Sequence, residues 1–153
     1  MTFDYMLDTN VFNDVLDGRI SLTALMGNRL LIIGVQAAEL RATQNSQRRT
    51  DLLAILEEVK PARKLASSAA WGVEGAGWGQ ARWNDGSGDF EEMLHRLEEL
   101  DRKRKRGKDP LNQLRDILIA ETAIKIAATL VSGDRNLRQV VSEFGGRATD
   151  HFP

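Results

Sequence analysis

Three short apolar runs, each followed by a polar turn and a helical stretch, constrain the fold of this chain most strongly. The runs are Phe3 to Leu7, Leu30 to Ile33 and Thr129 to Ser132. The second run is apolar at every position, as expected for a strand that is buried on both faces of its sheet. Short strands that alternate with helices predict an α/β fold, a doubly wound parallel sheet with helices on both faces.

Apolar periodicity predicts the helices between and after these strands. Helical stretches are expected over Val11 to Leu16, Leu22 to Met26, Val35 to Thr43, Leu52 to Val59, Phe90 to Leu100, from Leu111 onward, and over Leu137 to Phe144. The helix from Leu111 is apolar around nearly its whole circumference. We therefore expect it to be central and buried.

Length and charge set further bounds. With 153 residues, 42% of them hydrophobic, the chain is long enough for one compact domain, so we expect a single domain over residues 1–153. The formal net charge of -1 gives no overall positive field, so any basic footprint for nucleic acid must be local. Asp4 and Asp8 stand where a signal peptide would have a basic start and an apolar run. No apolar run is long enough to span a bilayer, so we expect a cytoplasmic protein.

The available residue types exclude several kinds of site. The sequence has no Cys, which excludes disulfides, thiolate nucleophiles and zinc–thiolate sites. Only His95 and His151 could supply an imidazole, so a histidine-rich metal site is not expected. The 22 Asp and Glu residues leave sites built from oxygen ligands open.

Four acids stand out by their positions. Asp8, Glu39 and Asp134 follow predicted strands, and Asp116 lies about a turn and a half into the apolar helix. In a parallel sheet the carboxyl ends of the strands form the crevice where ligands bind. Four carboxylates that converge without basic partners would repel one another, and a divalent cation resolves that conflict. An oxygen-only site suits Mg²⁺ or Mn²⁺, which can activate water for phosphodiester hydrolysis.

A simpler role is open for these acids when they are taken singly. An Asp at a strand end is often the N-cap of the next helix. Asp116 is least easily explained in this way, because a buried carboxylate is costly unless it is paired or binds a metal. Glu121 lies five positions further along and faces another direction. We expect it to be a surface group or one that supports the site from behind.

The sequence from Trp71 to Gly88 changes in character. Gly is dense here, and all three Trp residues of the chain, Trp71, Trp78 and Trp83, lie in this segment. We interpret residues 71–88 as a long loop or inserted segment. Its rings would either pin the loop to the core through their apolar area, or form a surface that stacks on bases or binds a partner.

A strongly basic run, RKRKRGK, follows the helix that begins near Phe90. As a solvated helix end it would balance Glu98, Glu99 and Asp101 and suit the helix dipole. Beside a carboxylate crevice it would instead guide phosphate groups. The candidate phosphate contacts are Arg102, Lys103, Arg104, Lys105, Arg106 and Lys108.

Several segments resemble the signature segments of PIN-domain ribonucleases. They are LDTN at residues 7–10, AAEL at 37–40, and RDILIAETAIKIAATLVSGDRNL at 115–137. The toxins of VapBC-type toxin–antitoxin pairs are the most similar of these in size and order. The resemblance spans nearly the whole chain except for about residues 60–107. It implies a three-layer α/β/α sandwich with a parallel sheet of about five strands, and a Mg²⁺- or Mn²⁺-dependent endoribonuclease.

The resemblance also implies roles for individual residues. The catalytic acidic quartet is matched by Asp8, Glu39, Asp116 and Asp134, of which Asp8, Asp116 and Asp134 would be metal ligands. Asn10 and Ser132 match polar positions that support the quartet. Asn136 stands where the family often has a further acid or amide near the metal.

The expected partners follow from the same resemblance. They are an RNA substrate, a cognate antitoxin and a second copy of the chain. The segment at 71–88 and the basic run are not part of the family pattern, so substrate and partner stay open.

Two other functions are compatible with parts of the sequence. Asp8 could be the nucleophile of a HAD-like phosphatase, but that class needs a second acid where this chain has Asn10. A catalytically inactive PIN-like module could bind RNA or protein through the basic run and the Trp-containing segment. Such a module has no need to maintain four costly carboxylates.

Overall fold

The computed structural model describes residues 3–66, 89–105 and 107–152. Its elements are β1 (Asp4–Leu7), α1 (Thr9–Leu16), α2 (Leu22–Met26), β2 (Arg29–Ile32), α3 (Gly34–Arg41), α4 (Ser46–Val59), β3 (Ala62–Arg63), α5 (Asp89–Lys103), α6 (Pro110–Lys125), β4 (Thr129–Val131), α7 (Arg135–Glu143) and β5 (Arg147–Thr149). The predicted strands and helices are all present. The Trp-containing segment predicted over residues 71–88 lies outside the described residues.

The strands form one parallel sheet with β1 at its centre. The order is β3-β2-β1-β4-β5, and Tyr5 of β1 is aligned with Leu30 of β2 on one side and with Thr129 of β4 on the other. The chain thus builds outward from β1 to β3, then returns and builds outward on the other side. The point between β1 and β4 where this order reverses is the position at which open α/β sheets form their ligand crevice.

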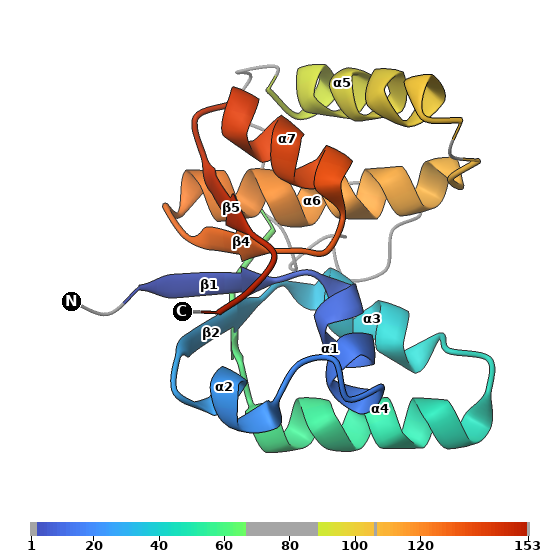
Figure 1. The fold of residues 1–153 in the computed structure, drawn as a ribbon, viewed down its shortest axis with the longest axis vertical. Coiled ribbons are helices and arrows are strands. Elements are labelled where there is room, and N and C mark those ends of the chain that lie inside the picture. Colours follow the sequence, from blue (N-terminus) through green and yellow to red (C-terminus); the bar gives the residue numbers. More distant parts are fainter. Residues whose placement is uncertain (1–2, 67–88, 106, 153) are drawn as a thin grey trace.

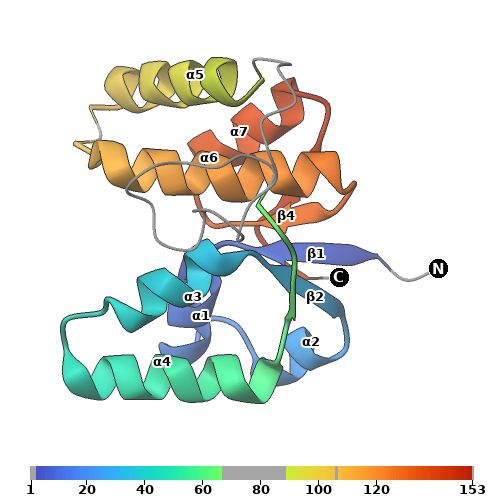
Figure 2. The ribbon, with the colours of Figure 1, turned by 180° about the vertical axis from the view of Figure 1, so that it is seen from behind.

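Helices cover both faces of the sheet (Figures 1 and 2). α1 to α4 lie on one side, and α5, α6 and α7 lie on the other. Successive residues of β1 point into the two cores, with Met6 on the α5–α7 side and Tyr5 and Leu7 on the α1–α4 side. This double burial explains why the central strands are apolar at consecutive positions, and it confirms the predicted α/β fold.

The helix predicted to be central, α6, is buried through its middle. Ile117, Leu118, Ile119 and Ala120 are all fully buried. Glu121 is only 2% exposed, so the expectation that it could be a surface group is wrong. None of the described helices is both long and apolar enough to cross a membrane.

Gly146, between α7 and β5, lies where a larger residue does not fit. A Cβ atom there would lie 2.6 Å from Ile124 Cγ1 and 2.8 Å from Val141 Cγ1. We expect Gly146→Ala to lower the free energy of unfolding by about 1–3 kcal/mol, the usual cost of overpacking. At Gly27 an added Cβ meets nothing within 4 Å, so Gly27→Ala is the control. Urea denaturation measures both, and equal midpoints for the two variants would contradict the expected clash.

Candidate functional site

Asp8 and Asp134 meet at the carboxyl ends of β1 and β4. The last residues of these strands, Leu7 and Val131, are register partners, so Asp8 and Ser132 emerge at the same edge of the sheet. Ser132 Oγ donates a hydrogen bond to Asp8 Oδ2 at 2.7 Å and accepts one from the Asp134 backbone N–H at 3.0 Å. One buried hydroxyl therefore fixes both aspartates at the switch point of the sheet.

Both aspartates also cap the helices that follow them. Asp8 Oδ1 accepts a hydrogen bond from Thr9 N at 2.8 Å, at the start of α1. Asp134 Oδ1 accepts from Asn136 N at 2.9 Å and from Leu137 N at 3.2 Å, at the start of α7. The capping role considered for these acids is therefore present. It uses one oxygen of each carboxylate, and the other oxygen accepts a hydrogen bond from Ser132 in Asp8 and from Lys108 in Asp134.

Glu39 joins this pair from α3. Thr9 Oγ1 donates a hydrogen bond to Glu39 Oε1 at 2.9 Å, so the residue next to Asp8 links the two acids. Sequence reasoning missed Thr9, which is buried, and selected Asn10, which is exposed on α1. The supporting role of Asn10 stays a prediction.

Asp116 reaches the cluster from α6 through a basic partner. Lys108 Nζ donates hydrogen bonds to Asp116 Oδ2 and to Asp134 Oδ2, the latter at 2.7 Å. The expectation that the four carboxylates converge without a basic partner is therefore wrong. The side chains of the three residues are 20%, 13% and 5% exposed for Lys108, Asp116 and Asp134, so these ion pairs are largely shielded from water.

Burial and mutual repulsion raise the pKa values of Asp8, Glu39 and Asp116. Burial raises the pKa of Asp116 to about 8, and the charge on Asp8 adds to the rise. Burial also raises the pKa of Asp8 and the pKa of Glu39 above the ordinary carboxyl range. Burial alone would lower the pKa of Lys108, but the ion pairs with Asp116 and Asp134 outweigh it and raise this pKa. A positive charge next to these carboxylates therefore stabilises their ionised form strongly.

The basic run divides into two parts. Arg102, Lys103, Arg104 and Lys105 are exposed, and Lys103 pairs with Glu99 at 3.1 Å, as expected for a solvated helix end. Arg106 lies outside the described residues. Lys108 differs from the others, because it lies inside the acidic cluster. Asp109 caps α6 directly after it by accepting a hydrogen bond from Leu111 N at 2.8 Å.

Asp101 is buried and hydrogen-bonded to two amides, so it does not neutralise the positive charges of the basic run, contrary to expectation. It is 1% exposed and accepts hydrogen bonds from Asn136 Nδ2 at 2.7 Å and from Gln113 Nε2 at 2.9 Å. Asn136, predicted near the metal, thus turns its amide nitrogen to Asp101, while its backbone N–H binds Asp134. The three side chains connect α5, α6 and α7 beneath the acidic cluster.

The atoms of the cluster are of the type that binds a divalent cation, but they are not arranged around a metal position. Asp8, Asp116, Asp134 and Ser132 offer only oxygen atoms, the ligands that Mg²⁺ and Mn²⁺ prefer. Within residues 3–66, 89–105 and 107–152, however, no group of three acids or histidines is arranged to hold a metal ion. Lys108 Nζ already binds one oxygen of Asp116 and one of Asp134, two of the acids that would hold such an ion.

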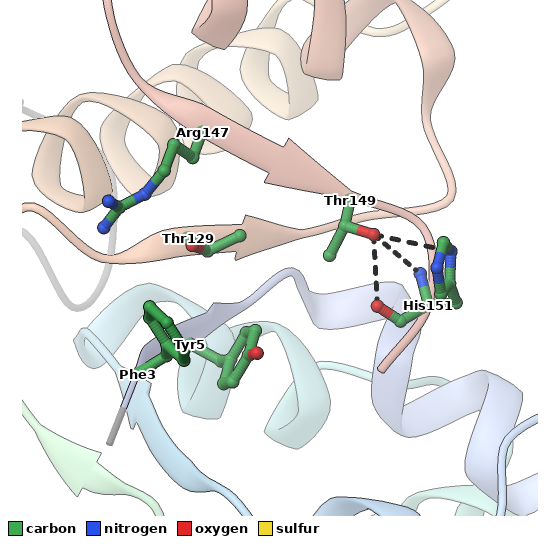
Figure 3. A pocket seen from close by; sticks show the side chains of 6 residues that line it. All are labelled: Phe3, Tyr5, Thr129, Arg147, Thr149 and His151. Atoms are coloured by element: carbon green, nitrogen blue, oxygen red, sulfur yellow. Dashed lines mark hydrogen bonds between the residues drawn. The ribbon is translucent and has the colours of Figure 1, made fainter. Parts of the chain in front are cut away.

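A separate hollow of about 350 Å³ lies over β1, β4 and β5 (Figure 3). It is lined by Phe3, Tyr5, Thr129, Arg147, Thr149 and His151. None of the four acids lines it, so it is distinct from the acidic cluster.

Comparison with known proteins finds similar folds among solved structures. VapBC2 from Rickettsia felis, bound to a promoter DNA fragment, is 17% identical over 99% of this chain and 100% of that chain, with a TM-score of 0.49. VapBC-1 from nontypeable Haemophilus influenzae is 17% identical over 97% and 98% of the two chains, with a TM-score of 0.49. FitAcB from Neisseria gonorrhoeae is 14% identical over 95% and 96%, with a TM-score of 0.43. No protein-family model matches the sequence, and no curated protein matches it.

Proposed function

We propose that the protein is a Mg²⁺- or Mn²⁺-dependent endoribonuclease and the toxin of a toxin–antitoxin pair. One observation carries the enzymatic part, namely that Asp8, Glu39, Asp116 and Asp134 are joined through Ser132, Thr9 and Lys108 at the switch point of the sheet. Four carboxylates held together with little exposure are costly to maintain. A site that binds cations next to a substrate phosphate accounts for that cost.

Each part of the cluster has a task in phosphodiester hydrolysis. Asp8, Asp116 and Asp134 would hold the metal ion, which when bound polarises a phosphoryl oxygen and lowers the pKa of water. Ser132 and the capped helix starts keep Asp8 and Asp134 in place. Glu39 would accept the proton of the attacking water. Burial raises its pKa, which makes its carboxylate a stronger base, and Thr9 fixes its Oε1.

The substrate and partner assignments rest on charge and on the sequence resemblance. The exposed cations Arg102, Lys103, Arg104 and Lys105 precede Lys108 in the sequence, and they would contact RNA phosphates. The antitoxin is proposed from the VapBC-like segments at residues 7–10, 37–40 and 115–137. A second copy of the chain is proposed on the same ground.

Cleavage of a mixed set of structured and single-stranded RNAs tests the proposal. We expect the purified protein to cut RNA with Mg²⁺ or Mn²⁺, to stop with chelator, and to be inactive as Asp116→Ala. The control is Glu58→Ala, because Glu58 is an exposed acid of α4. Circular dichroism checks that both variants are folded. Binding of RNA without cleavage under every metal would favour the inactive module instead.

A further inference from the structure

The ammonium group of Lys108 binds two of the acids that would hold the proposed metal ion, Asp116 and Asp134. We propose that Lys108 is a built-in competitor of the divalent cation, an ammonium group that holds Asp116 and Asp134 together until a metal ion displaces it. This inference rests on the proposed metal-dependent function. It adds that the metal affinity of the protein is set by one lysine of its own chain.

The contacts of Lys108 disfavour simultaneous binding of a metal ion by the same two carboxylates. Its Nζ atom binds Oδ2 of both aspartates, at 2.7 Å in the case of Asp134. Mg²⁺ binds carboxylate oxygens at about 2.0–2.1 Å. A metal ion bound by these two oxygens would compete with the ammonium group for the same acceptor atoms, and the two positive charges would repel strongly at such short distances.

The influence of Lys108 extends over the whole acidic cluster. Its charge acts on Asp8, Glu39 and Asp116, in addition to the hydrogen bond with Asp134. Arg115 also acts on Glu39 through its charge, but the hydrogen bonds from an ammonium group to Asp116 and Asp134 come from Lys108, and the remaining described cations of the basic run are exposed. Lys108 therefore supplies the balancing charge that a metal would otherwise supply.

The position of Lys108 also allows it to leave. Its side chain is 20% exposed, so the ammonium group has a route to solvent on a flexible four-carbon stem. Its backbone stays in place, because Asp109 and Pro110 fix the start of α6 immediately after it. Displacement by a metal then requires only a change of side-chain rotamers.

Metal titration of a matched pair of variants tests this inference. Lys108→Met keeps an unbranched stem and removes the charge, and Lys103→Met makes the same change of net charge in the exposed part of the basic run. By calorimetry with Mn²⁺, we expect Lys108→Met to lower Kd at least about tenfold and Lys103→Met to leave it within about twofold of wild type. We also expect Mn²⁺ to raise the melting temperature of Lys108→Met more than that of wild type.

An equal or higher Kd for Lys108→Met would overturn the inference, and so would the absence of Mn²⁺ binding by every form. Wild-type RNA cleavage with metal, together with an unchanged Kd in Lys108→Met, would overturn this inference alone and leave the proposed function intact.

Nuclear magnetic resonance of wild type covers the case in which Lys108→Met does not fold. We expect the Lys108 NH₃⁺ signal, assigned through its own side-chain carbons, to be visible without metal and lost when Mg²⁺ is added. A signal that persists at saturating Mg²⁺ would show that Lys108 is not displaced.

Discussion

Asp8→Asn is expected to reduce RNA cleavage by about a thousandfold or more while leaving the fold intact. The substitution keeps the size of the side chain and an oxygen that accepts from Thr9 N, the capping bond at the start of α1. The hydroxyl of Ser132 can reverse and accept a hydrogen bond from the new amide, since it has two lone pairs. What is lost is the negative charge that the cation requires.

The matching control lies at the start of β1, the strand that Asp8 follows. Asp4 begins β1 and pairs with Arg29 at 3.2 Å near the surface, so Asp4→Asn makes the same chemical change away from the acidic cluster. We expect it to keep its cleavage rate within about twofold, because exposed ion pairs contribute little. Initial rates with Mn²⁺, measured beside urea denaturation, compare the two variants. More than a tenth of the wild-type rate in Asp8→Asn would contradict a catalytic role for Asp8.

The central strands and two of the acids were predictable because their signals are local. Leu30 to Ile33 is apolar at consecutive positions, as a strand covered on both faces requires. Asp8 and Asp134 directly follow such strands, and parallel pairing brings strand ends that are far apart in sequence to one edge. The edge strands β3 and β5 gave no such signal. They are two and three residues long and contain no buried residue, so the backbones of their neighbours determine their pairing.

The residues that sequence reasoning misplaced are those whose role depends on tertiary contacts. Lys108 is one cation in a basic run, and nothing in the sequence separates it from its exposed neighbours. Asp101 likewise resembles the surface acids of an amphipathic helix. Thr9 was passed over for Asn10, because only the packing of α3 against α1 determines which of the two faces Glu39.

Asp101→Leu is expected to lower the free energy of unfolding by about 2–4 kcal/mol, because it leaves buried amides without partners. Asp101 is the only carboxylate among the described residues that joins Asn136 and Gln113, and both bonds are buried. Asn136 Oδ1 is already buried without a partner among the described residues. Rotating the Asn136 amide by 180° in the variant would not restore a hydrogen bond, because leucine has no donor or acceptor in its side chain. Each polar group left unpaired costs about 1–3 kcal/mol.

Two further variants separate this loss from a general effect of the substitution. Asp101→Asn keeps the shape of the side chain but offers one oxygen to two amide donors, so we expect a smaller loss than for leucine. Glu92→Leu changes an exposed acid of the same helix and should shift stability by less than about 0.5 kcal/mol. Urea denaturation without metal measures the free energy of unfolding of all three variants. An Asp101→Leu midpoint equal to that of Glu92→Leu would contradict the expected effect.

The same variants connect the buried network to the acidic cluster. Asn136 holds Asp101 through its side chain and Asp134 through its backbone N–H. Loss of Asp101 therefore loosens the start of α7, where Asp134 is fixed. We expect Asp101→Asn, measured at a temperature where it is fully folded, to cleave RNA more slowly than Glu92→Leu. Full cleavage at reduced stability would show that the network stabilises the helices without positioning Asp134.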